Sequence, residues 1–432
     1  AAAVVCFVLD VAGLLPTVLV TASADVLVLS FPFDVQMSGW SPVPVLASVL
    51  ALVLGPMLPA GRWDRSVFFD MACISQSDPR LKSEGIASLA GFLDKSKELI
   101  VLWSPHSLSR LWCVFEMAVY SALEGDDRRI TFCPLFIFGI CFAGYVFLGL
   151  SFFIFSMYYT LPTLPLESGK EVGLLAMMAG ASSMVALLVH WGRSFMREKH
   201  RFLQELAHFD VENAQCREAA DEQFIKQSIE HWYGSTASFN EFVRGPMAQK
   251  IDRAMQGLEG TYRTCVMMTA PQHTFALQWM ASILRVGSNV PFAVIMSQLL
   301  WGCSNSFLIL PVHLKMSFLA MERCQQALES RAADVALSTA LSISLVLSYY
   351  SMCLFGAHVR DASFALVVAW VGVWTLLAYS VFSVPPASRI MAAGEGATSS
   401  RRPSHQESHC CSESDLGASG DVDEAGSPVH SV

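Results

Sequence analysis

The chain has 432 residues, of which 53% are hydrophobic and only 15% are charged, and its mean hydropathy is +0.45. Soluble domains carry about a quarter charged residues, so this composition excludes an ordinary soluble protein and predicts a mostly α-helical multi-pass membrane protein. The formal net charge is −9, from 28 Lys and Arg against 37 Asp and Glu, which excludes the basic surface of a nucleic-acid-binding protein.

The cysteine pattern and the first residues bear on disulfides, metal binding and a signal peptide. The 12 cysteines are scattered without a CxxC pair or a His/Cys spacing typical of a metal site. We therefore expect buried thiols, no disulfide framework and no bound metal. The first ten residues, AAAVVCFVLD, contain neither methionine nor a basic stretch, which favours a fragment of a longer chain over a signal peptide.

Seven apolar runs are candidates for membrane-spanning helices, because about 20 such residues cross the core of a bilayer. They cover 1–22, 41–60, 130–157, 171–192, 288–311, 334–355 and 363–385. The first run is weakened by Asp10 and Pro16, since a carboxylate inside a bilayer is costly. We expect membrane hairpins over 1–60 and 130–192 and a bundle of about three spans over 276–386.

Basic residues predict the orientation of these spans. They follow the second span, precede the third and follow the fourth, at Arg62, Arg65, Arg128, Arg129, Arg193, Arg197, Lys199 and Arg201. Because Lys and Arg favour the cytosolic side, we expect 61–129 and 193–275 to face the cytosol. The side of the tail stays open: its arginines favour the cytosol, whereas seven spans would place it outside.

Residues 61–129 differ from the rest of the chain in charge and pattern. Three short runs suit buried parallel strands, at 66–69, at 98–103 and from Arg129 into the third span. Two helices lie between them, the first capped by Ser83 and the second by Ser109. The buried face of the second should be Leu111, Phe115, Ala118, Val119 and Ala122. The order β-α-β-α-β predicts a small, incomplete parallel sheet.

The region 193–275 shows two apolar stripes at helical spacing. They consist of Phe202, Leu206 and Phe209, and of Phe224, Ile225, Ile229 and Trp232 before a stop at Gly234. We expect a helical bundle that packs on itself. The tail, 387–432, has too few large apolar residues to fold and should be disordered, with Cys410 and Cys411 as candidates for S-acylation if it faces the cytosol.

Trp112 and Glu116 lie one turn apart on a side of the second helix that its apolar stripe leaves free. We expect this pair near the carboxyl ends of the strands or on the flank of the sheet; ligands of open α/β sheets bind at those carboxyl ends. Desolvation beside Trp112 would shift the pKa of the Glu116 carboxylate. The ordinary alternative is a solvated Glu116 paired with Arg110 or Arg128.

The string FFDMACISQSD…GIASLAGFLDKSKELIVLWS…RLWCVFEMA resembles the middle of a TIR (Toll/interleukin receptor) domain. A strand ending at Asp70, a polar loop, Ser96-Lys97, Ser104 and the Trp-Cys-x-x-Glu helix follow in that family's order. The string is also similar to TIR-like segments of multi-pass membrane proteins from algal protists. The resemblance covers about 64–135 and implies a flavodoxin-like parallel sheet.

The resemblance implies two activities. In NAD-cleaving TIR domains the glutamate of this helix is the catalytic carboxylate, which points to Glu116, with Trp112, Asp70 and Ser104 as ligand-binding residues. NAD would be a substrate, and no cofactor is implied; a carboxylate can stabilise the oxocarbenium-like state of such a cleavage. In signalling TIR domains the module self-associates, and the interaction surface here would include Ser75, Gln76, Asp78 and Pro79.

Three hypotheses follow: an interaction module for signalling, a membrane-tethered NAD hydrolase, and a channel or transporter. The chain has apolar spans where the family has its first and last strands, and it shows no glycine loop for phosphates. We therefore favour the interaction module, with the lipid bilayer and a second TIR-like segment as partners. A transporter would require mutually facing polar residues in the last three spans, and the isolated charges Asp10 and Arg285 could mark its ion pathway.

Overall fold

The computed structural model describes most of the chain as far as Ser383. The described residues are 2–20, 35–57, 66–75, 77–104, 107–123, 129–134, 139, 142–147, 149–151, 154, 169–216, 219–256, 260–286 and 290–383. They belong to the first of two compact units, Ala1–Gly394. Several parts of the predicted third span (135–138, 140–141, 148, 152–153 and 155–157), the loop residue Gln76, the tail and its Cys410 and Cys411 lie outside the described residues.

The amino-terminal part contains short elements in place of the first predicted span. Helix α1 (Ala2–Val11) is followed by the antiparallel pair β1 (Val18–Val20) and β2 (Val35–Met37), then by α2 (Pro42–Leu54) and the 3₁₀ turn η1 (Gly55–Met57). The helix expected over 1–22 therefore ends at Val11. Gly13, with φ of 72°, and Pro16 account for this end.

Asp10 and Arg285, the two isolated charges in the apolar runs, are paired with each other. Asp10 is completely buried and lies 3.1 Å from the Arg285 guanidinium. Its carboxylate also accepts hydrogen bonds from Ser38 Oγ and Trp40 Nε1, at 2.5 and 2.6 Å. Arg285 donates in turn to the carbonyl oxygen of Gln36. This pair fixes the β1–β2 hairpin to the end of helix α13 (Ala270–Leu284), which is a structural role and not evidence of a pathway.

Among the described residues, three stretches of helix are long and apolar enough to cross a membrane. The first, Phe292–Arg323, combines α14 (Phe292–Ser304), a π-helical turn η4 (Asn305–Ile309) and α15 (Leu310–Arg323). The others are α16 (Arg331–Ala362) and α17 (Phe364–Ser383). They contain most of the last three predicted spans. The predicted span 171–192 lies within α8 (Gly169–Ala207), a continuous helix of 39 residues.

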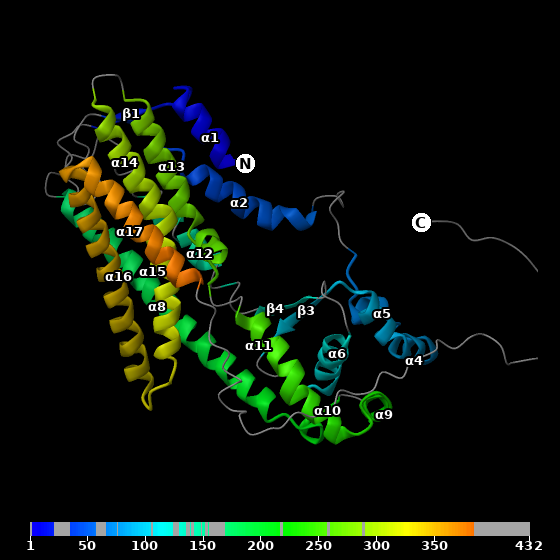
Figure 1. The fold of residues 1–432 in the computed structure, drawn as a ribbon. Helices are drawn as coiled ribbons and strands as arrows, with labels where there is room; N and C mark the ends of the chain where they lie inside the picture. Colours follow the sequence, from blue (N-terminus) through cyan, green and yellow to red (C-terminus); the bar gives the residue numbers. More distant parts are fainter. Residues whose placement is uncertain are drawn as a thin grey trace, which may run out of the picture. The chain divides into compact units, whose positions relative to one another are not determined.

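The charged segment contains α3 (Asp70–Cys73), α4 (Pro79–Ala87), α5 (Leu89–Lys95), β3 (Glu98–Trp103), α6 (Leu111–Ala122) and β4 (Arg129–Pro134) (Figure 1). Strands β3 and β4 are parallel, in register from Glu98 opposite Arg129 to Trp103 opposite Pro134. The prediction of two parallel strands is confirmed. The predicted strand at 66–69 is wrong: these residues join no ladder, so the described sheet has two strands.

Both predicted caps in this segment are also wrong. The first helix begins at Pro79, one turn before Ser83, because the Asp78 side chain accepts hydrogen bonds from the backbone N–H groups of Arg80 and Leu81. The second helix has Arg110 at its N-cap position, without a side-chain cap. Its first N–H, that of Leu111, instead donates to the carbonyl of a distant residue, as described below.

The region after α8 is helical, as expected. It contains η2 (Val211–Asn213), α9 (Ala219–Tyr233), α10 (Thr236–Phe242), a π-helical turn η3 (Val243–Met247), α11 (Ala248–Gln256), α12 (Tyr262–Met268) and α13 (Ala270–Leu284). Helix α9 ends one residue before Gly234, whose φ of 79° suits the left-handed conformation at a helix end. The predicted stop is confirmed.

This helical region does not pack only on itself, which corrects the expectation of a self-contained helical bundle over 193–275. One hydrophobic core contains residues of α5, β3, α6 and β4 together with residues of α8 to α11. Trp103 of β3 makes edge contacts with Phe195 and Phe202 of α8, with ring centroids 5.8 and 5.4 Å apart. The covered face of the sheet is thus closed by helices from much later in the chain.

A short backbone bridge locks the two segments together. The N–H of Leu111 donates to the carbonyl of Gln215 at 3.1 Å, and the N–H of Gln215 donates to the carbonyl of Ser109 at 2.8 Å. Residues 110 and 215 therefore form an isolated parallel bridge. The start of α6 is therefore fixed by a backbone segment that lies about a hundred residues later in the sequence.

Candidate functional site

Helix α6 carries the candidate catalytic pair. Most of its residues are buried in the shared core, namely Leu111, Val114, Phe115, Met117, Ala118, Val119, Tyr120 and Ser121. Ala122, expected on the buried face, is exposed. Trp112, Cys113 and Glu116 are half-buried on the remaining side. The helix thus has one narrow side on which polar chemistry is possible.

Trp112 and Glu116 are in direct contact, as their spacing predicts. Trp112 Nε1 donates a hydrogen bond to Glu116 Oε1 at 2.9 Å. Burial and, to a smaller extent, the negative charge of Asp70 raise the pKa of Glu116 to about 7, against the lowering effects of the Trp112 hydrogen bond and of Arg110. A carboxyl group that titrates near neutrality is suited to general acid–base chemistry.

Asp70 belongs to this site, whereas Ser104 shows only local contacts. Asp70 is the first residue of α3, and its charge raises the pKa of the Cys113 thiol, which burial raises more strongly. The described hydrogen bonds of Ser104 are with Ser107: its N–H donates to Ser107 Oγ at 3.0 Å, and the two hydroxyl oxygens are 3.3 Å apart. Ser104 forms a turn after β3.

The expected interaction loop forms the start of α4. The N–H of Asp78 donates to Ser75 Oγ at 3.3 Å, and Asp78 caps the helix whose first residue is Pro79. Asp78 is exposed and Ser75 is half-buried. The loop is accessible, but these hydrogen bonds account for the polar residues as turn and cap formers.

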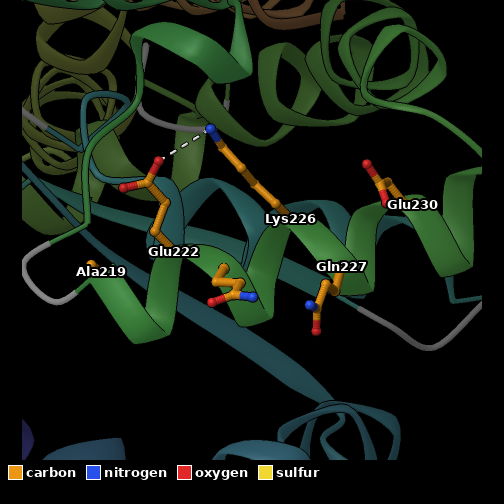
Figure 2. A pocket seen from close by; sticks show the side chains of 6 residues that line it. Ala219, Glu222, Lys226, Gln227 and Glu230 are labelled. Atoms are coloured by element: carbon orange, nitrogen blue, oxygen red, sulfur yellow. Dashed lines mark ion pairs between the residues drawn. The ribbon is translucent and has the colours of Figure 1, made fainter.

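The described residues contain no group of three His, Cys, Asp or Glu side chains that could hold a metal ion. A hollow lies along α9, and all of its lining residues come from that one helix (Figure 2). Its Lys226 is paired with Glu222 and with Glu212, each at 3.1 Å. A hollow on a single helix, with its lysine paired to two glutamates, is a solvated surface, and it contains none of the predicted site residues.

The open face of the β3–β4 sheet was missed from the sequence. The run ELIVLW suggested a strand buried on both faces, but Ile100 and Leu102 are 50% and 55% exposed. Their cross-strand neighbours on this face are Thr131 and Cys133. A uniformly apolar run carries no alternation, so only Glu98, two residues before Ile100, signalled that one face is open.

The raised pKa of Glu116 predicts a dependence of stability on pH. Since the unfolded carboxyl ionises near its ordinary pKa of 4.5 and the folded one near 7, stability from Glu116 is complete below about pH 4.5 and is lost as the pH rises through 7. Glu116→Gln keeps an acceptor for Trp112 and should raise the free energy of unfolding at pH 8 by about 2 kcal/mol.

The measurement is thermal or denaturant unfolding in detergent at about pH 4.5 and about pH 8. Glu230→Gln, at an exposed position of α9, is the control and should leave the pH dependence unchanged. Equal pH dependence in wild type and Glu116→Gln would contradict the assignment.

No family model matches the chain, and neither a curated protein nor a solved structure is similar to it.

Proposed function

We propose that the chain is a multi-pass membrane protein whose TIR-like segment, facing the cytosol, is an interaction module that binds a second copy of itself. The membrane part is supported by three long apolar helices. Their exposed surface carries large apolar side chains, including Val335, Leu347, Leu366, Val373 and Leu376. Such side chains suit contact with lipid hydrocarbon.

The observation that carries the interaction is the open face of the sheet. Parallel sheets are normally covered on both faces, and within the part of the chain that the structure describes, helices cover only the face of Trp103 and Phe132. The opposite face leaves Ile100 and Leu102 exposed. Because membrane anchoring raises the effective concentration of identical modules, a small apolar face is sufficient for weak self-association of the kind that the TIR resemblance implies.

Ile100→Glu should abolish most of this association. The side chain is half-exposed, so the fold should tolerate it, but a carboxylate buried in a face-to-face contact costs more than about 1.4 kcal/mol, or at least about tenfold in affinity. The measurement is co-purification of two differently tagged copies from membranes. Gln227→Glu adds the same charge on exposed α9 and should have no effect. Unchanged co-purification of Ile100→Glu would contradict the proposal.

A second candidate, a membrane-tethered NAD hydrolase, is favoured by one observation. Glu116 combines a raised pKa with a hydrogen bond from Trp112 and proximity to Asp70. NAD consumption by the full chain in nanodiscs that disappears in Glu116→Gln would support this function. Turnover that persists in that variant, or no turnover by folded wild type, would contradict it.

A further inference from the structure

The membrane helix α16 has its polar side turned inward. Its buried residues are Asp334, Ser338, Ser342, Cys353, Gly356, Ala357 and Arg360, without one large apolar side chain among them. Its exposed residues include Val335, Ile343, Leu347, Met352 and Phe355. The buried positions form two groups, Asp334 to Ser342 and Cys353 to Arg360. From Asp334 to Arg360 the helix rises by about 39 Å, which exceeds the roughly 30 Å of a bilayer core.

Charged and titratable groups meet at the first end of this stripe. Arg193 of α8 donates to Ser338 Oγ at 2.7 Å and pairs with Asp334 at 2.8 Å. Arg197 lies 3.6 Å from the same carboxylate. His190 Nδ1 lies 3.0 Å from Ser338 Oγ and 4.0 Å from Asp334. The histidine is thus connected to the stripe through a hydroxyl group.

A second set of exchangeable groups lies in the middle of α16. His313 Nε2 of α15 is 2.8 Å from the Leu345 carbonyl and 3.4 Å from the hydroxyl of Ser348, which lies at an exposed position of α16. The His313 ring contacts Tyr349, whose hydroxyl lies 3.5 Å from Asn305 Oδ1. Cys353 Sγ lies 3.6 Å from the same Asn305 oxygen. Asn305 begins the π-helical turn η4, a type of irregularity frequent at functional sites.

Helix α14 adds buried polar atoms that lack a hydrogen-bond partner within the described part of the chain. They are Gln298 Oε1, Trp301 Nε1 and, in η4, Ser306 Oγ, and each residue is at most 3% exposed. Trp301 stacks under the Arg360 guanidinium at 4.9 Å, and Arg360 is neutralised by Asp361 at 2.7 Å. Unpartnered polar groups in an otherwise close-packed bundle suit ordered water.

We propose that the buried face of α16 is a proton pathway, with His313 as its central proton-accepting group. Buried polar side chains in membrane helices are costly, and where they form chains of His, Asp and hydroxyl groups they serve proton transfer. Histidine exchanges protons near neutral pH. Arg360 is paired with Asp361 at one end of the stripe, and at the other end Arg193 and Arg197 share the Asp334 carboxylate. The species transferred is H⁺, driven by its gradient. This inference rests on the membrane insertion proposed above but not on self-association.

The test is proton flux into proteoliposomes of the full chain, driven by a potassium diffusion potential and followed with a pH-sensitive dye. Wild type should exceed protein-free liposomes. His313→Gln keeps a donor to the Leu345 carbonyl but cannot titrate, and its flux should fall to the protein-free level. Ser344→Ala, at an exposed position of α16 where the hydroxyl bonds only its own helix, should match wild type.

Each alternative outcome has a defined meaning. Wild-type flux equal to that of protein-free liposomes, in vesicles shown by flotation to contain the protein, would overturn the pathway alone. Flux unchanged in both His313→Gln and His313→Phe would overturn the role of His313. Failure of the chain to insert would overturn the pathway together with the membrane assignment, whereas loss of self-association would leave the flux unaffected.

Discussion

Replacing Arg193 by methionine is expected to lower the free energy of unfolding by about 3–5 kcal/mol, since removal of one partner leaves the other charge buried and uncompensated. Arg193 is completely buried, and its guanidinium uses all its nitrogens: it bonds the carbonyls of Cys324, Gln326 and Asp334, the Ser338 hydroxyl and the Asp334 carboxylate. It therefore caps the end of α15 and fixes the start of α16 to α8. Methionine retains the apolar stem but none of these bonds.

Arg201→Met provides the matched control. Arg201 is also on α8 and is also ion-paired, to Glu205 at 2.8 Å, but its side chain is 67% exposed. An exposed pair one turn apart contributes about 0.3–0.5 kcal/mol. The measurement is unfolding in detergent of wild type and both variants. A loss in Arg193→Met no larger than that in Arg201→Met would show that the buried guanidinium does not hold α8, α15 and α16 together.

Trp103→Ala should destabilise the protein by about 3–5 kcal/mol, the usual cost of removing a buried tryptophan. The side chain is 1% exposed and packs between the sheet and α8, against Phe195 and Phe202. The cavity would open inside the shared core. In limited proteolysis of the variant, we therefore expect cleavage sites in α8 and in β3 to become accessible together.

Trp232→Ala is the corresponding control. Trp232 lies on α9, is 44% exposed and touches Phe115 with ring centroids 5.9 Å apart. Its loss should cost about 1 kcal/mol or less. If Trp103→Ala exposed only β3 to protease and left the α8 sites protected, the two segments would have separate cores.

The sequence predicted what depends on local pattern. The apolar runs of α14 to α17 predict long helices because bilayer-length hydrophobic stretches have few alternatives. The spacing of Trp112 and Glu116 predicts their contact because residues four apart on a helix are neighbours. Likewise, β3 and β4 follow from two apolar runs joined by a helix, which require a parallel crossover.

The sequence could not reveal interactions between distant segments. The bridge between 110 and 215 and the contact of Trp103 with α8 depend on tertiary packing across about a hundred residues. Arg193 and Lys199 contributed to the basic cluster that predicts a cytosolic side, yet they are only 0% and 1% exposed. The sequence alone does not distinguish a basic residue that faces solvent from one that is buried against a partner.

The predicted strand at 66–69 shows the same limit on a smaller scale. Its apolar, β-prone residues satisfy the local pattern, but strand formation needs a neighbour with free backbone groups in register. Among the described residues, Phe68 instead stacks on Phe92 of α5, with ring centroids 4.3 Å apart. Phe68 is only partly buried, and Val67 and Phe69 are 72% and 52% exposed, so the local pattern was wrong about both the backbone ladder and the burial of this run.

The most direct test of the central claim, that α5, β3, α6 and β4 form one body with helices α8 to α11, is native-state hydrogen exchange of the full chain in nanodiscs. The shared core predicts that amides of β3, β4, the second half of α8 and α11 open with a common free energy. Trp103→Ala should lower that free energy equally in all four elements. Independent opening of β3 and β4, with α8 and α11 unaffected, would contradict the account.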